Sequence, residues 1–149
     1  MNTEPRLIRI LAVDDHPLLR DGIAALISIA PDMQLVGACS NGREAVEQFR
    51  TLRPDVTLMD LQMPVMSGLE AIAVIRGEFS DARIIVLTTY AGDVQVVRAF
   101  KAGASAFLVK NLAHQELLDT IRSVHRGRKA ISPEVSSDRV ADATDDELL

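Results

Sequence analysis

The sequence predicts an α/β fold in which five parallel strands form a sheet covered by helices on both faces. Two observations lead to this prediction. Five short apolar runs alternate with longer amphipathic segments, and no two consecutive runs are joined by a hairpin-type turn. Because parallel strands need crossover connections, five strand–helix units favour a sheet that is buried on both faces.

The first two strand–helix units are expected to occupy residues 8–52. Residues 8–13 and 33–39 are apolar runs expected to form strands, and residues 17–29 and 42–52 are expected to form helices. Apolar residues recur at helical spacing in both helices: Leu19, Ile23, Leu26 and Ile27 in the first, and Ala45, Phe49 and Leu52 in the second.

The last three units are expected to have short, buried strands. Ser67 is a suitable N-cap for the third helix, and Gly103 is placed to end the fourth. The expected strands are residues 56–59, 84–87 and 106–109, and the expected helices are residues 69–78, 93–102 and 113–126.

Right-handed crossovers leave few topologies for so small a chain. We expect a flavodoxin-like, doubly wound sandwich with strand order 2-1-3-4-5, whose ligand lies at the carboxyl ends of the first and third strands. Residues 1–7 are expected to be a tail, residues 8–127 the folded domain, and residues 128–149 a linker. The chain becomes polar and acidic from about Ser132.

Composition narrows the function classes. A net charge of −5 and an aromatic content of 3% argue against nucleic-acid binding by this part of the chain. No apolar run approaches the roughly 20 residues that span a bilayer, and no signal-type segment follows the N-terminus, so we expect a cytoplasmic protein without membrane association. Cys39 is the only cysteine, and we interpret it as a small buried hydrophobe.

Acidic residues follow the first and third expected strands. Asp14 and Asp15 come after residues 8–13, and Asp60 comes after residues 56–59. In the expected topology these three carboxylates meet at one edge of the sheet. Two such charges about 4 Å apart repel by roughly 4 kcal/mol at an effective dielectric constant of 20. A hard divalent cation with oxygen ligands would compensate this repulsion, and Mg²⁺ fits best.

Two further polar residues follow the fourth and fifth expected strands. Thr88 and Lys110 are both expected to point into the same edge. Three carboxylates, one divalent metal and Lys110 give a balanced charge. Phosphorylation of Asp60 would replace one negative charge with a group of roughly −2, which would attract Lys110 and the Thr88 hydroxyl. This change of charge offers a physical basis for a switch.

Each of these residues also has a simpler interpretation. Asp14 and Asp15 precede His16-Pro17 and a helix, where acids commonly cap. Asp60 could form a turn, and Lys110 could be a solvated loop residue. It is the joint placement at one edge that favours a site. For His16, a role in the helix-entry loop is favoured over binding of a softer metal.

The combined pattern resembles the receiver domain of two-component response regulators. The resemblance covers about residues 8–126. It rests on Asp14-Asp15, Met59-Asp60, Pro64, Gly68, Leu87-Thr88, Ala102-Gly103-Ala104 and Phe107 through Lys110. The segment from Val13 to Arg20 is similar to the NarL/FixJ subfamily in particular. Its members carry a C-terminal, LuxR-type helix-turn-helix that binds DNA, and the present chain is expected to stop in the linker before such a domain.

The resemblance implies a role for each matching residue. Asp60 would be the phosphoacceptor nucleophile, and Thr88 and Lys110 would hold the phosphoryl oxygens. Phe107 occupies the position of the aromatic residue that changes rotamer on activation, with Thr88 as its switch partner. Asn111 stands where many receivers have proline, so a trans peptide is expected there. The implied Mg²⁺ ligands, with Mn²⁺ as an alternative ion, are Asp15 directly, Asp14 largely through water, Asp60 and the backbone carbonyl of Gln62.

The predicted function is that of a phosphorylation-dependent switch for a transcription-regulating output domain. Its partners would be a sensor histidine kinase and, on phosphorylation, a second copy of the chain. DNA would be bound only through the C-terminal domain. Apolar residues on more than one side of the fourth helix (Val94, Val96, Val97 and Phe100) make a face of helix four, strand five and helix five one candidate dimer surface. The first and fifth helices form the other.

Two alternative functions would use parts of the same pattern. An aspartyl-nucleophile phosphohydrolase usually needs a second acid two residues after the nucleophile, where this chain has Gln62. A flavodoxin-like cofactor-binding module would need a phosphate-cradling loop after the first strand. The segment Asp14–Pro17 is anionic and lacks glycine. Beyond its own phosphorylation and dephosphorylation, no enzymatic activity is expected.

Overall fold

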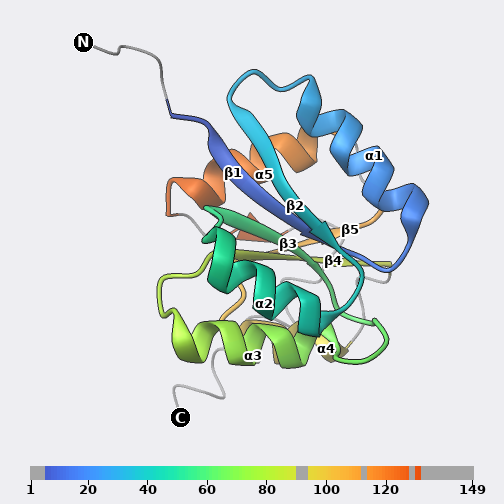
Figure 1. Cartoon of the computed structure of the whole chain (residues 1–149), viewed down its shortest axis with the longest axis vertical. Coiled ribbons are helices and arrows are strands. Elements are labelled where there is room, and N and C mark those ends of the chain that lie inside the picture. Colours follow the sequence, from blue (N-terminus) through green and yellow to red (C-terminus); the bar gives the residue numbers. More distant parts are fainter. Residues whose placement is uncertain (1–5, 90–93, 112–113, 128–129, 132–149) are drawn as a thin grey trace.

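The computed structural model of the chain describes residues 6–89, 94–111, 114–127 and 130–131. Helices and strands alternate along this part of the chain (Figure 1). The strands are β1 Ile8–Val13, β2 Met33–Cys39, β3 Val56–Asp60, β4 Ile84–Thr88, β5 Ala106–Val109 and β6 Ala130–Ile131. The helices are α1 Pro17–Ser28, α2 Gly42–Leu52, α3 Gly68–Glu78, α4 Val94–Ala102 and α5 His114–His125.

The strands form one parallel sheet in the order β2-β1-β3-β4-β5-β6. The first five positions confirm the predicted flavodoxin-like order. β3 and β4 are each one residue longer than expected, so Asp60 and Thr88 are the last residues of their strands. The reversal of strand order at β1 and β3 places the ends of these two strands where a doubly wound fold binds its ligand.

A short sixth strand was not predicted. β6 contains only Ala130 and Ile131, which pair with Ala106 and Phe107 of β5. This pairing falls within residues 128–149, the range expected to be linker. The other residues of that range lie outside the described part of the chain. Asp93 and Ala113, the expected first residues of the fourth and fifth helices, also lie outside it.

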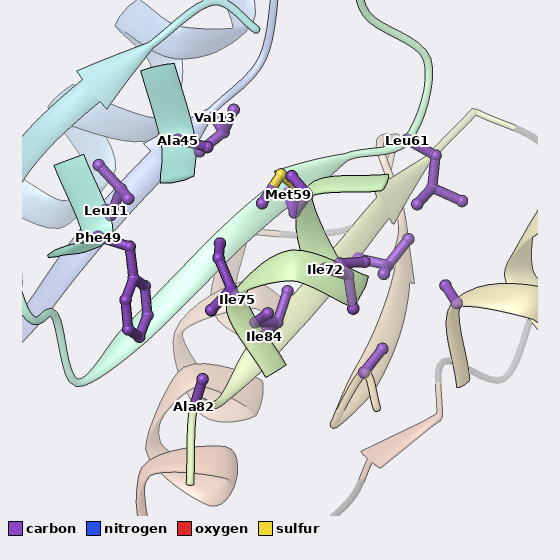
Figure 2. Close-up of a cluster of buried hydrophobic side chains, with 14 of the residues drawn as sticks. Leu11, Val13, Ala45, Phe49, Met59, Leu61, Ile72, Ile75, Ala82 and Ile84 are labelled. Carbon is purple, nitrogen blue, oxygen red and sulfur yellow. The ribbon is translucent and has the colours of Figure 1, made fainter. Parts of the chain in front are cut away.

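Alternation along the strands produces two apolar layers, one on each face of the sheet. Leu11 and Val13 of β1 point to the layer formed with α2, α3 and α4, whereas Ile10 and Ala12 point to the layer formed with α1 and α5. Figure 2 shows the first layer, in which Phe49 of α2 is drawn near Leu11 of β1 and Ile75 of α3. Burial of these two layers holds the strand ends in fixed relative positions.

The start of α3 is held by a capping box. The Ser67 hydroxyl accepts a hydrogen bond from the backbone N–H of Glu70, and the Glu70 carboxylate accepts from the backbone N–H of Ser67. This confirms Ser67 as the predicted N-cap, an interaction typically worth about 1 kcal/mol.

Two helix boundaries differ by one residue from the prediction. Helix α1 ends one residue earlier than expected, and helix α3 begins one residue earlier than expected.

Cys39 is buried at the end of β2, as predicted. Burial, and to a smaller extent the nearby Glu44, raise the pKa of the Cys39 thiol to about 12.

Among the helices of the described residues, none has the length and apolar character required to cross a membrane.

Candidate functional site

The carboxyl edge of the sheet gathers the polar residues that were predicted to meet there. Asp14 follows β1, Asp60 ends β3, Thr88 ends β4 and Lys110 follows β5. The pairing of β3, β4 and β5 is in register up to these ends, and the backbone N–H of Lys110 donates to the Thr88 carbonyl at 2.7 Å. The sheet itself therefore fixes the relative heights of these residues.

Lys110 forms ion pairs with two carboxylates that are almost completely buried. Its Nζ lies 2.9 Å from Asp14 Oδ2 and 3.2 Å from Asp60 Oδ1. The side chain of Asp14 is 0% exposed, that of Asp60 is 6% exposed and that of Lys110 is 11% exposed. One cation therefore compensates two acids, which leaves this part of the site short of positive charge.

Asp60 shows this shortage most clearly. Burial and the neighbouring Asp14 raise the pKa of the Asp60 carboxyl, and Lys110 opposes the shift only in part. Asp60 Oδ1 is near Lys110 Nζ and also accepts a long hydrogen bond, at 3.4 Å, from the backbone N–H of Gln62. Asp60 Oδ2 is buried and accepts no hydrogen bond from any residue that the structure describes. A buried carboxylate oxygen without a partner fits a site that binds a cation.

Asp15 and Gln62 complete the set of predicted metal-ligating residues. Asp15 is partly buried, with 32% of its side chain exposed. Asp14, Asp15, His16 and Asp60 each offer one ligand atom, and these atoms lie within 4.8 Å of one another. Gln62 lines the same hollow as Asp60. The donor chemistry, mostly carboxylate oxygen, therefore fits the divalent cation that was predicted.

A hollow of about 210 Å³ opens over Asp60. It is also lined by His16, Leu61, Gln62, Thr88, Thr89 and Lys110. Thr88 is 5% exposed and lies in the wall of this hollow. Such a hollow can admit a small anionic group beside Asp60, with Thr88 and Lys110 next to it.

Phe107 lies beneath this edge. It is completely buried, and its ring centroid lies 4.2 Å from that of Phe100 on α4, at an interplanar angle of 56°. A change of the Phe107 rotamer would therefore alter its contact with Phe100. Of the apolar residues noted on the fourth helix, Val96 is buried, and Val94 is 56% exposed.

Two contacts at the site were missed by the sequence analysis. Arg20 of α1 donates from Nη1 to the backbone carbonyl of Asp14 at 2.7 Å, which ties the helix to the acidic loop. The His16 ring lies inside the acidic cluster, with Nδ1 2.7 Å from Asp14 Oδ1. Arg20 follows Asp14 by six residues, so its reach back to the loop depends on the angle at which α1 leaves the strand. Sequence spacing does not specify that angle.

The loop between β3 and α3 is shaped by a close backbone approach. A Cβ atom on Gly68 would lie 1.9 Å from the Asp60 carbonyl oxygen. The backbone N–H of Gly68 donates to the Leu61 carbonyl at 2.9 Å. Only glycine permits α3 to begin this close to the residue that ends β3.

The doubly wound fold, with acids after β1 and β3 and a lysine after β5, defines a receiver-type signalling domain. Comparison with protein-family models supports this class: the response regulator receiver domain matches residues 10–122. The chain therefore belongs to the response regulator receiver family.

Individual relatives place it more narrowly. The chain is 40% identical over 131 residues to the nitrate/nitrite response regulator protein NarL of Escherichia coli (strain K12), covering 88% of this chain and 60% of the relative. It is also 40% identical over 130 residues to the transcriptional regulatory protein LiaR of Bacillus subtilis (strain 168), covering 87% and 62%. The chain thus spans about 60% of the length of these relatives.

Solved structures agree with this assignment. A LuxR-family two-component response regulator from Aurantimonas sp. SI85-9A1 superposes with a TM-score of 0.84 at 35% identity, covering 93% of this chain and 98% of that one. The signal receiver domain of NarL from Mycobacterium tuberculosis superposes with a TM-score of 0.79 at 30% identity, covering 83% and 100%. The chain is accordingly a receiver domain of the NarL/LuxR type.

Proposed function

We propose that Asp60 accepts a phosphoryl group from a partner histidine kinase and that the domain acts as a switch for a transcription-regulating output domain. One observation carries the proposal: the buried Asp60 carboxylate lies 3.2 Å from Lys110 Nζ in a hollow that Thr88 also lines. This arrangement places a nucleophile, a cation and a hydroxyl around one small space. Family membership favours this function over the phosphohydrolase and cofactor-binding alternatives.

The chemistry follows from the charge state of Asp60. An ionised carboxylate needs no general base to act as a nucleophile. One Asp60 oxygen would form a bond to phosphorus while the phosphorus–nitrogen bond of the kinase phosphohistidine breaks. The departing imidazole nitrogen keeps the electron pair of that bond. The product is an acyl phosphate on Asp60, and attack by water later releases inorganic phosphate and restores the carboxylate.

Lys110 and Thr88 would respond to the new group. Lys110 is already paired with Asp14 and Asp60, so a phosphoryl group of roughly −2 charge on Asp60 would draw its ammonium toward the phosphoryl oxygens. The Thr88 hydroxyl, at the end of β4, would donate to another of these oxygens. The Phe107 ring, packed on Phe100 of α4, provides a path from this movement to the surface of α4.

The residues that would hold Mg²⁺ or Mn²⁺ are Asp14, Asp15, Asp60 and the backbone carbonyl of Gln62. Asp60 Oδ2, which accepts no hydrogen bond from the described residues, supports this assignment. When bound, the ion would neutralise charge on the transferring phosphoryl group. Asp14 would also hold Lys110 in place through its ion pair.

Phosphorylation would promote pairing of two copies, since helix-turn-helix domains usually bind two-fold operators as dimers. Of the two candidate surfaces, the α1–α5 side is favoured by an exposed leucine and an apolar groove among the described residues. Leu18 of α1 is 87% exposed. An apolar groove of about 140 Å³ runs between α1 and α5, lined by Leu19, Ile23, Leu26, Leu87, Val109 and Leu117 among others. The protein would act in the cytoplasm.

A small phosphorus–nitrogen donor tests the proposed function without the kinase. Incubation with phosphoramidate and Mg²⁺, followed by electrophoresis in a phosphate-affinity gel, should produce a retarded band that disappears on heating at alkaline pH, as acyl phosphates do. Asp60→Asn should give no such band, whereas Asp21→Asn, at an exposed position on α1, should behave as the wild type. A retarded band that persists in the Asp60→Asn protein would refute the assignment.

A further inference from the structure

The His16 side chain occupies a position that helix stability does not explain. His16 is the N-cap residue of α1, but its side chain makes no capping hydrogen bond. Residues that stabilise this position are usually Ser, Thr, Asp or Asn, whose oxygens accept from the first turn of the helix. The imidazole ring instead turns back over the sheet edge, toward the acids that follow β1 and end β3.

The buried carboxylates divide their oxygens between Lys110 and His16. Lys110 Nζ lies 2.9 Å from Asp14 Oδ2 and 3.2 Å from Asp60 Oδ1. His16 Nδ1 faces the other oxygen of each acid, 2.7 Å from Asp14 Oδ1 and 4.0 Å from Asp60 Oδ2. It also lies 3.2 Å from Asp15 Oδ1. His16 Nδ1 therefore lies within 4.0 Å of an oxygen of each of three carboxylates, and Lys110 Nζ lies 3.5 Å from the same nitrogen.

The three distances from His16 Nδ1 to carboxylate oxygens are close to the donor spacing around an octahedral ion. With metal–ligand bonds of 2.0–2.1 Å, adjacent donors lie about 3.0 Å apart and opposite donors about 4.2 Å apart. The distances from His16 Nδ1 to Asp14 and Asp15 correspond to adjacent donors, and the distance to Asp60 Oδ2 to opposite donors. In addition, Asp60 Oδ2 is buried and has no hydrogen-bond partner among the described residues. This oxygen provides an independent indication that a cation belongs between the acids.

We propose that His16 Nδ1 is a direct ligand of the ion held by Asp14, Asp15 and Asp60, and that it makes the site selective for first-row transition ions over Mg²⁺. Mg²⁺ prefers oxygen donors, whereas imidazole suits transition ions such as Co²⁺, Ni²⁺ and Zn²⁺. This inference rests on the proposed metal-dependent function of the site. The simpler alternative is that Nδ1–H only donates a hydrogen bond to Asp14.

Electron spin-echo spectroscopy of the Mn²⁺-loaded wild-type protein distinguishes these two possibilities without any substitution. A directly bound imidazole produces nitrogen modulation, and the pattern changes when histidine alone is labelled with ¹⁵N. His16→Phe keeps a ring but removes the donor, and should abolish the modulation. His114→Phe is the matched control, because His114 is exposed at the start of α5 and does not belong to the cluster.

Affinities provide the second readout. Co²⁺ binding, followed by visible absorption, should weaken about tenfold or more in His16→Phe. Mg²⁺ binding, measured by competition, should change by less than about twofold, because oxygen ligands dominate its coordination. Equal weakening of both ions, or a wild-type spectrum without histidine nitrogen coupling, would overturn the inference.

The outcomes separate this inference from the proposed function. If wild-type Asp60 is phosphorylated in Mg²⁺ but the Mn²⁺ protein shows no nitrogen coupling, only the role of His16 is refuted. If no ion binds, both the inference and the metal part of the proposed function fail. If ions bind with nitrogen coupling but Asp60 gains no phosphate, the phosphoacceptor proposal fails and the ligand assignment stands.

Discussion

Lys110 and Asp60 form an ion pair across an intervening strand, with 3.2 Å between Nζ and Oδ1. Lys110 follows β5 and Asp60 ends β3, and β4 lies between them in the sheet. Lys110 therefore interacts with the charge of Asp60 across the end of β4, and Thr88 is the last residue of that strand. Any group that changes the charge on Asp60 acts at once on the ends of three adjacent strands.

The unfavourable charge at Asp60 should cost stability. Because burial and Asp14 raise the pKa of Asp60 above its unfolded value, the ionised form destabilises the folded state at neutral pH. Asp60→Asn should therefore increase the free energy of unfolding at pH 7 by about 1 kcal/mol. Urea denaturation in the presence of EDTA measures this change. The gain should shrink as the pH falls through the raised pKa, since the wild-type carboxyl then becomes neutral, and a destabilised Asp60→Asn protein would contradict this explanation.

Gly68 should tolerate no side chain. Gly68→Ala places a Cβ 1.9 Å from the Asp60 carbonyl oxygen, so the start of α3 or the end of β3 must shift. We expect a loss of about 1–3 kcal/mol in unfolding free energy. Gly77→Ala in the same helix is the control, because no atom lies within 4 Å of its added Cβ. That variant should gain about 0.5–1 kcal/mol. If the two variants change the unfolding free energy by similar amounts in chemical denaturation, helix propensity rather than the close approach to Asp60 determines the effect of Gly68→Ala.

The pair of Asp32 and Arg122 links the start of β2 to α5 and should respond to acid. Arg122 donates from Nε and Nη2 to the two Asp32 oxygens, at 2.8 and 3.0 Å, and its hydrogen bond lowers the pKa of Asp32 below 3.8. The folded pKa is thus below the unfolded one, so the stabilisation is present above pH 3.8 and is lost as the pH falls through the folded value. Both side chains are partly exposed, so Asp32→Asn should cost less than about 1 kcal/mol at pH 7. Thermal unfolding at pH 7 and at pH 3 measures the loss, which should be smaller at the lower pH; an equal loss at both would refute the electrostatic origin.

Dimerisation through α1 and α5 should depend on Leu18. Sedimentation velocity of the chain with beryllofluoride and Mg²⁺ should show a dimer that Leu18→Asp weakens at least tenfold, since a charge would be buried at the interface. Val94→Asp on α4, at a position that is 56% exposed, should leave the dimer unchanged. If Val94→Asp weakens the dimer and Leu18→Asp does not, the interface lies on the α4 side. A monomer at about 100 µM in both states would rule out a phosphorylation-driven dimer of this chain.

Much of this site could be predicted because its residues lie at the ends of strands. In a parallel sheet, residues after successive strands meet at one edge whatever the details of packing, which is why Asp14, Asp60, Thr88 and Lys110 were expected together. The orientation of the His16 ring could not be predicted in this way. It depends on a side-chain rotamer at a helix start, where capping or a turn would have satisfied the same sequence pattern.

The unpredicted strand β6 has a different explanation. Two residues cannot show the period-2 alternation by which a strand is recognised, and Ala130 and Ile131 precede a polar segment. Their pairing depends on the free edge of β5, which is a tertiary feature. The close approach of Gly68 to Asp60 is likewise tertiary, although the glycine itself was noted.

Intact-protein mass spectrometry tests directly whether Asp60 alone accepts the phosphoryl group. The wild-type protein, Asp60→Asn and the exposed-site control Asp21→Asn would each be incubated with acetyl phosphate and Mg²⁺. We expect the mass of one added phosphoryl group on the wild-type and Asp21→Asn proteins and none on Asp60→Asn. A phosphoryl group on Asp60→Asn at the wild-type rate, or none on a folded wild-type protein, would contradict this expectation.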